Sequence, residues 1–199
     1  MKLRLLIGLS LLFLLVGCAS DSAEMPNRKQ LAEADSGVLL IALTRTGDMK
    51  GQLRYTFEAL PSRFYGMPDT EKPETGTLVL DATPEESDYP GVTGRLLNVA
   101  LPAGDYRITG WELSHWTGSR RSVQPLDIRF RVYPKRYTYA GELRMSIAAA
   151  PVEDVFVRVK GAAERDMRWL QMRYPDFDFT RFTVSTMETH LPSSLVEGE

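Results

Sequence analysis

The sequence predicts a mainly β protein: an antiparallel β-sandwich of about eight or nine strands, with one helix at about residues 162–174. Short runs that are apolar, or that alternate between apolar and polar residues, recur from about Gly37 onward. Turn residues such as Pro102-Ala103-Gly104 separate these runs. A length of 199 residues with a single helical stretch fits one sandwich domain of ordinary size.

The strand candidates follow one another along the chain. Residues 38–44 are apolar at nearly every position, which is typical of a central strand that is buried on both faces. Residues 52–58 alternate instead, and they place Leu53, Tyr55 and Phe57 on one face. The other candidate strands are residues 77–82, 95–101, 105–113, 126–132, 136–147, 154–160 and 181–187.

The numbering of apolar residues predicts a β-bulge in the strand 105–113. Tyr106 and Ile108 have even numbers, whereas Trp111 and Leu113 have odd numbers. Side chains alternate along a strand, so one extra residue near Gly110 is needed to keep all four on the same face.

A hairpin is predicted between residues 126–132 and 136–147. The apolar residues are even-numbered in the first strand and odd-numbered in the second. If the hairpin has one apolar face, Val132 lies opposite Tyr137 in the pairing.

The helix and two long loops complete the domain. Pro175 ends the predicted helix. Residues 60–75 and 83–91 form loops that are rich in Pro, Glu, Asp and Thr. The apolar stripe of the helix comprises Ala163, Met167, Leu170 and Tyr174. The aromatic and Met residues of the first loop either form a contact surface or fold back onto the sandwich; they are Phe64, Tyr65 and Met67.

Composition argues against several classes of function. The formal net charge is −2, whereas a nucleic-acid binder normally carries a clear basic excess. The single cysteine rules out an intramolecular disulfide framework, and with only two histidines it argues against a Cys/His zinc site. The sequence contains no G-x-S-x-G, H-E-x-x-H or phosphate-loop motif. We therefore predict no catalytic residue, metal or cofactor. The alternative is a hydrolase whose two carboxylates meet in a cleft.

The N-terminus has the architecture of a targeting segment. Lys2 and Arg4 precede an apolar run over residues 5–16. As a helix, this run would be roughly 18 Å long, which is short of the ~30 Å hydrocarbon core of a membrane. The stretch Leu15-Val16-Gly17-Cys18 resembles the lipobox of bacterial lipoproteins, which implies cleavage before Cys18 and attachment of lipid to it.

This resemblance implies a division of the chain and a location. Residues 1–17 form the signal peptide, 18–36 a lipidated flexible tether, 37–190 the sandwich domain and 191–199 a C-terminal tail. In Gram-negative lipoproteins an Asp just after the Cys typically marks retention in the inner membrane, and Ala19 stands there instead. We therefore expect a cell-envelope protein on the outer membrane, facing the periplasm.

Two segments of the domain carry a second resemblance. The segment Leu101-Pro102-Ala103-Gly104-Asp105-Tyr106-Arg107-Ile108 has a turn that leads into a strand with Tyr. The segment Val132-Tyr133-Pro134-Lys135-Arg136-Tyr137-Thr138-Tyr139-Ala140-Gly141-Glu142-Leu143 has a second such turn. Both resemble motifs of bacterial envelope lipoproteins with a transthyretin-like or carboxypeptidase-regulatory-like sandwich. Such domains are usually non-catalytic, which implies a binding or accessory module.

Two groups of residues are candidates for binding a partner. Trp111 and Trp116 either form a platform for a carbohydrate or belong to the core. Arg129, Arg131 and Arg144 are predicted to share an outer face of the sheet. That face is either a solvated surface or a docking site for an envelope protein or an anionic glycolipid.

Overall fold

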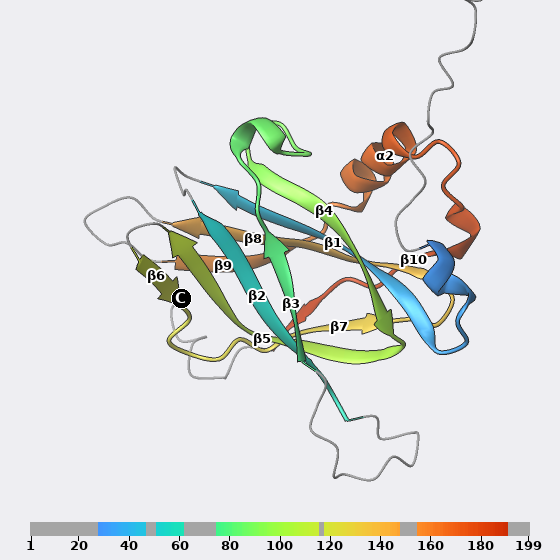
Figure 1. Ribbon diagram of the computed structural model, residues 1–199, viewed down its shortest axis with the longest axis horizontal. Helices are drawn as coiled ribbons and strands as arrows, with labels where there is room; N and C mark the ends of the chain where they lie inside the picture. The colour runs from blue at the N-terminus through green and yellow to red at the C-terminus, as the bar shows by residue number, and fades with distance from the viewer. Residues whose placement is uncertain (1–27, 47–50, 62–74, 116–117, 148–154, 191–199) are drawn as a thin grey trace, which may run out of the picture.

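Two β-sheets stack face to face in the computed structural model and enclose the main apolar core (Figure 1). The structure describes residues 28–46, 51–61, 75–115, 118–147 and 155–190. The five-stranded sheet contains β1 (Ser36–Thr46), β4 (Thr93–Pro102), β8 (Tyr137–Ile147), β9 (Val155–Lys160) and β10 (Phe182–Val184). The six-stranded sheet contains β2 (Gln52–Ala59), β3 (Thr75–Leu80), β5 (Gly104–His115), β6 (Gly118–Arg121), β7 (Ile128–Val132) and β11 (Glu188–Thr189).

The predicted β-sandwich with one α-helix is confirmed, with more strands than expected in the part of the chain described. The α-helix is α2 (Ala163–Arg173), and three short 3₁₀ helices accompany it: η1 (Arg28–Ala32), η2 (Pro84–Glu86) and η3 (Phe179–Arg181). The predicted strand 181–187 is divided, because β10 joins the five-stranded sheet and β11 the other. None of the helices in the described residues is long and apolar enough to cross a membrane.

The five-stranded sheet is mixed, which corrects the expectation of antiparallel pairing throughout. β1 lies between β4, with which it is antiparallel, and β8, with which it is parallel. β10 is also parallel to β8. Because β1 is central and covered on both faces, its nine residues from Gly37 to Arg45 are all buried, as its continuous apolar run predicts.

A second apolar cluster covers the outer face of this sheet. Leu40 of β1, Tyr139 of β8 and Leu170 of α2 belong to it, together with Leu31 of η1. Leu31 is only 3% exposed, so the packed structure begins before Gly37. The predicted tether over residues 18–36 therefore overlaps the packed domain from residue 28 onward.

The bulge expected near Gly110 is confirmed. Thr56 of β2 pairs with Gly110 of β5, and the next residue, Phe57, pairs with Ile108. Thr109 is the extra residue. Tyr106, Ile108, Trp111 and Leu113 consequently all pack against the core between the sheets.

The predicted hairpin of residues 126–132 with 136–147 is wrong. β7 pairs with β5 and β11, whereas β8 lies in the other sheet and pairs with β1, β9 and β10. The connection between β7 and β8 therefore passes from one sheet to the other. Apolar alternation fits this arrangement as well, because each strand can direct its apolar side chains to the common core from its own sheet.

Candidate functional site

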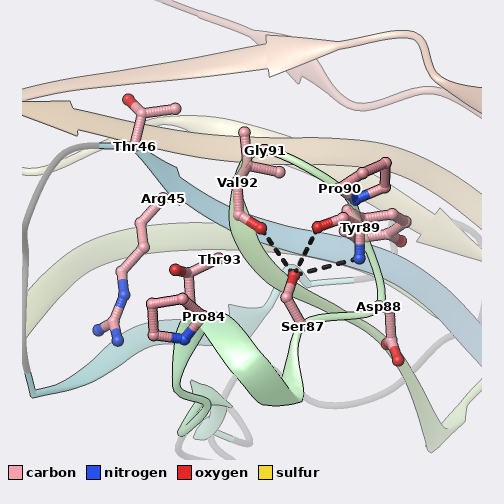
Figure 2. Close-up of a pocket in the computed structure, with 10 residues that line it drawn as sticks. All are labelled: Arg45, Thr46, Pro84, Ser87, Asp88, Tyr89, Pro90, Gly91, Val92 and Thr93. Carbon is pink, nitrogen blue, oxygen red and sulfur yellow. Dashed lines mark hydrogen bonds between the residues drawn. The ribbon is translucent and has the colours of Figure 1, made fainter.

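A pocket of about 480 Å³ opens beside the end of β1 (Figure 2). Arg45 and Thr46 of β1 form one part of its lining. Residue 84 and residues 87–93, which lead from η2 into β4, form the rest. This volume lies within the range of ordinary small-molecule sites, which is about 300–1,000 Å³.

Ser87 organises the segment that forms the rim of the pocket. Its Oγ accepts hydrogen bonds from the backbone N–H groups of Tyr89, at 3.1 Å, and Gly94, at 2.9 Å. Its hydroxyl lies 2.7 Å from the carbonyl oxygen of Val92, to which it donates (Figure 2). One side chain thus fixes three backbone positions, so the rim is held in shape without a ligand.

Arg45 is a buried cation at this pocket. The residue is only 3% exposed, and its guanidinium donates to the carbonyl oxygens of Gly51 and, at 2.8 Å, of Ala82. Its Nε has no hydrogen-bond partner. Burial lowers the pKa of Arg45, and the charge of Asp81 partly offsets this effect. Within the described ranges no carboxylate forms an ion pair with this guanidinium.

Tyr89 links the pocket to a buried ionic network below α2. The guanidinium carbon of Arg165 lies 4.0 Å from the centre of the Tyr89 ring, in a cation–π arrangement. The Tyr89 hydroxyl is buried, and it makes no well-formed hydrogen bond with the neighbouring Asp166 carboxylate. Burial, followed by the nearby charge of Asp166, raises the pKa of Tyr89, so the hydroxyl stays protonated at neutral pH.

Two buried carboxylates share the Arg165 guanidinium. Nε of Arg165 lies 2.8 Å from Oδ1 of Asp166, and Nη1 lies 2.9 Å from Oε2 of Glu142. Glu142 also accepts hydrogen bonds from Thr44, at 2.5 Å, and from Arg144, at 2.6 Å. Burial alone would raise the pKa of Glu142, but these hydrogen bonds and the charges of the two arginines outweigh it and lower the pKa.

The carboxylate pair is enclosed. Asp166 is 0% exposed and Glu142 is 1% exposed, and neither lines the pocket beside β1. The sequence allowed two carboxylates to meet in a cleft, as in a hydrolase. The structure brings these two to one arginine, in a position where they fasten α2 to the sheet. Among the residues that the structure describes, no group of three or more His, Cys, Asp or Glu could hold a metal ion.

The three predicted binding arginines do not share a face. Arg129 and Arg131 point outward from β7 in the six-stranded sheet, while Arg144 lies on β8 in the five-stranded sheet. Each is also paired. Arg129 and Arg131 bind the carboxylates of Asp127, at 2.9 Å, and Asp105, at 2.6 Å. The common cationic face expected from a β7–β8 hairpin is therefore not formed, because those strands are not neighbours.

The predicted aromatic platform is described only in part. Trp111 is partly buried on β5, pairs with Tyr55 of β2 and packs against the core between the sheets. This is the packing alternative that its strand position allowed. Trp116 lies outside the described residues, as do Cys18, Phe64, Tyr65 and Met67.

Sequence reasoning missed Arg45 and Asp166 as buried charges. Arg45 comes at the end of an apolar run, where a charged residue usually marks the return to solvent. Asp166 offered a clearer signal. It follows Ala163 by three positions and precedes Leu170 by four, which places it on the apolar stripe of the helix.

Comparisons with known proteins provide no family for this chain. No family model matches it, and no curated protein matches it. A solved structure of a leucine-rich repeat protein from Bacteroides thetaiotaomicron is similar over 57% of this chain, with 17% identity and a TM-score of 0.34. The match spans 14% of that protein. Likeness at this level carries no argument about fold or function, so the site has to be interpreted from its own chemistry.

Proposed function

We propose that the protein is a lipid-anchored protein of the cell envelope whose sandwich is a non-enzymatic binding or accessory module. The observation that carries the proposal is Cys18. It is the single cysteine of the chain, and it follows a basic start, an apolar run and the stretch Leu15-Val16-Gly17. We further propose that the anchor is in the outer membrane and that the sandwich faces the periplasm.

The start of the packed domain supports a position close to the membrane. Leu31 of η1 is buried against the sheet, and η1 begins at Arg28. The sequence places residues 19–27 between Cys18 and this helix. Nine residues span at most about 30 Å when fully extended, so a lipid on Cys18 would hold the sandwich within that distance of the bilayer surface. Such a tether suits a module that acts beside the membrane.

Metabolic labelling with a fatty-acid analogue tests the anchor. The wild-type chain should incorporate the label, and Cys18→Ser should abolish incorporation and leave an uncleaved or soluble form. Ala19→Ser is the matched control, because it changes the neighbouring residue and keeps the thiol. Equal labelling of the wild type and Cys18→Ser would show that the lipoprotein assignment is wrong.

A separate experiment addresses the binding role. The rim of the pocket is pre-formed by Ser87, which favours binding because little ordering is needed when a ligand enters. Envelope components that co-purify with the detergent-solubilised chain should be identified and compared with those of a pocket variant. A hydrolytic activity of the purified chain that Glu142→Gln removes, with folding retained, would contradict the non-enzymatic assignment and favour carboxylate chemistry.

A further inference from the structure

We propose that the free edge of strand β9 binds an extended, acidic segment of a partner protein, which adds a strand to the five-stranded sheet. This inference rests on the proposed binding role of the sandwich and gives that role a class of partner. It does not depend on the lipid anchor.

Strand β9 lies at the edge of its sheet. It pairs with residues 142–147 of β8, and β1 occupies the other side of β8 (Figure 1). Among the residues that the structure describes, no strand pairs with the second edge of β9. Every second residue of an edge strand directs its backbone N–H and C=O away from the sheet, so these groups can pair with another extended chain.

The side chains of β9 offer an added strand two different surroundings. Its three valines pack against the core between the sheets but are only partly buried: Val155, Val157 and Val159. Phe156, Arg158 and Lys160 alternate with them on the outer face and are exposed, Phe156 to 44%. A partner strand that continues the sheet would place apolar side chains beside the valines and its alternate side chains beside the exposed residues.

The outer face of β8 and β9 carries an excess of cations. The pairing places Arg158 of β9 directly opposite Arg144 of β8, and like charges in this position repel each other. Glu142 pairs with Arg144 at 2.6 Å, but its carboxylate also binds Arg165. In the described ranges neither Arg158 nor Lys160 forms an ion pair with a carboxylate. Acidic side chains on an added strand would lie beside these two cations and compensate them.

An acidic segment fits this edge better than the other occupants do. Two β9 strands side by side would bring two copies of Arg158 and Lys160 to one outer face, and edge strands commonly avoid self-association by such charges. A lipid surface would compensate the cations, but it offers no chain to pair with the backbone groups of the edge. An extended acidic segment supplies the carboxylates, the apolar side chains and the backbone partners together.

The capped peptides Glu-Val-Glu-Val-Glu-Val and Glu-Glu-Glu-Val-Val-Val form a matched pair of probes. They have the same composition and charge, but only the first can direct all its glutamates to one face of a strand. Each should be titrated by calorimetry into the detergent-solubilised full chain. We expect the alternating peptide to bind at least about tenfold more tightly than the block peptide. Its affinity should fall as the salt concentration rises from ~0.1 M to ~1 M.

Hydrogen exchange of the β9 amides reports strand addition directly. Under saturating alternating peptide, the amides that face the free edge gain backbone acceptors. Exchange at alternate residues of β9 should therefore become slower by about tenfold or more. Electrostatic attraction without backbone pairing would leave these exchange rates unchanged.

Arg158→Glu separates binding from folding. Its side chain is exposed, and the new carboxylate would lie opposite Arg144, so the fold should be retained, as thermal unfolding can verify. The variant should bind the alternating peptide about tenfold more weakly, because an attraction becomes a repulsion. Lys135→Glu is the matched control. It makes the same change in net charge at an exposed residue outside β8 and β9, and it should keep the affinity within about threefold.

Four results would overturn the proposal. The first three are equal binding of the two peptides, unchanged exchange of the β9 amides under saturating peptide, and equal affinity of the wild type and Arg158→Glu. The fourth is slower exchange of these amides without peptide. If that slowing follows protein concentration, the occupant is a second copy, and if it follows addition of phosphatidylglycerol to the micelles, the occupant is a lipid surface.

Labelling of Cys18 is measured independently of these experiments. Failure of peptide binding with lipidation intact would thus reject the partner class alone. Loss of labelling with peptide binding intact would reject the anchor alone.

Discussion

The Tyr139 hydroxyl donates a hydrogen bond of 2.5 Å to the carboxylate of Asp166 and so joins strand β8 to helix α2. Both residues are almost completely buried, with exposures of 1% and 0%. Burial and then the hydrogen bond to Asp166 raise the pKa of Tyr139, so the hydroxyl remains a donor at physiological pH. Together with Arg165, this contact fixes the position of α2 over the five-stranded sheet.

Replacing Asp166 should strongly destabilise the protein. Asp166→Ala leaves the Tyr139 hydroxyl and the Arg165 guanidinium without their shared acceptor. We expect a loss of about 3 kcal/mol in the free energy of unfolding, at the low end for a buried pair because the Arg165 side chain is 34% exposed. Urea denaturation of the purified chain measures this loss.

Glu164→Ala is the control for this measurement. Glu164 lies two positions earlier on the same helix and pairs with Arg168, but its side chain is 88% exposed. Water and salt screen such a pair, so the free energy of unfolding should hardly change. Similar losses for the two variants would mean that the helix, and not the buried carboxylate, determines the effect.

Protonation of Glu142 should lower the stability of the folded protein in acid. Its pKa in the folded state is lowered from the ordinary value of 4.5, so the unfolded chain takes up a proton at a higher pH than the folded chain does. Its contribution is therefore complete above about pH 5 and is lost as the pH falls through the folded-state pKa. Unfolding free energies measured between pH 3 and pH 7 should fall less steeply for Glu142→Gln than for the wild type. Equal slopes would contradict this role of Glu142.

Two buried tyrosines should respond in opposite ways to removal of the hydroxyl. Tyr106 donates a 2.6 Å hydrogen bond to the carbonyl oxygen of Pro102, across the turn before β5. Tyr106→Phe should therefore cost about 1 kcal/mol. The Tyr55 hydroxyl is buried without a partner, so Tyr55→Phe should be neutral or stabilising. Thermal or urea unfolding of both variants tests the contrast, and a comparable loss in Tyr55→Phe would reveal a partner for its hydroxyl.

Most strands could be predicted because their pattern is set by local burial. The continuous apolar run of residues 38–44 indicated a strand covered on both faces, and β1 is the central strand with that property. The change from even to odd apolar residues around Gly110 indicated a bulge, and Thr109 is the extra residue. In both cases the burial of a strand face determines which positions carry apolar side chains, so the order of apolar and polar residues along the chain indicates the structure.

The assignment of strands to sheets could not be predicted in the same way. Alternation shows that β7 and β8 each have an apolar face, but it does not show whether the two faces belong to one sheet or to two sheets packed together. The apolar residues of β8 are odd-numbered, which suggested that they share one face, but they do not. Tyr139 faces the helix, whereas Leu143 faces the core between the sheets, because Ala140 is an extra residue between them.

The candidate site was less predictable than the fold. Arg45 and the rim residue Ser87 come from segments that lie 42 positions apart, and no local pattern connects them. The ionic network joins Thr44, Glu142 and Asp166, whose contacts depend on the parallel pairing of β1 with β8. Such contacts follow from topology, and the sequence alone did not establish that topology.

The bulge in β8 depends on Gly141, and its replacement should be costly. Leu40 of β1 pairs with Tyr139, and the next residue, Ile41, pairs with Gly141, which has a φ of +101°. Alanine is strained at this φ, and its Cβ would lie 3.0 Å from the carbonyl oxygen of Lys160. Gly141→Ala should lower the free energy of unfolding by about 1–3 kcal/mol.

Gly161→Ala provides the matched control for that loss, since no atom lies within 4 Å of a Cβ built at Gly161. Chemical denaturation should show a change of less than about 0.5 kcal/mol for Gly161→Ala, as for ordinary surface substitutions. Without the bulge, Leu143 would turn away from the core between the sheets and Glu142 would turn into it. Because the chain cannot accept that exchange, residue 141 has to adopt a positive φ, which glycine does without strain. Equal stability of Gly141→Ala and the wild type would therefore show that the positive φ is not required for the bulge.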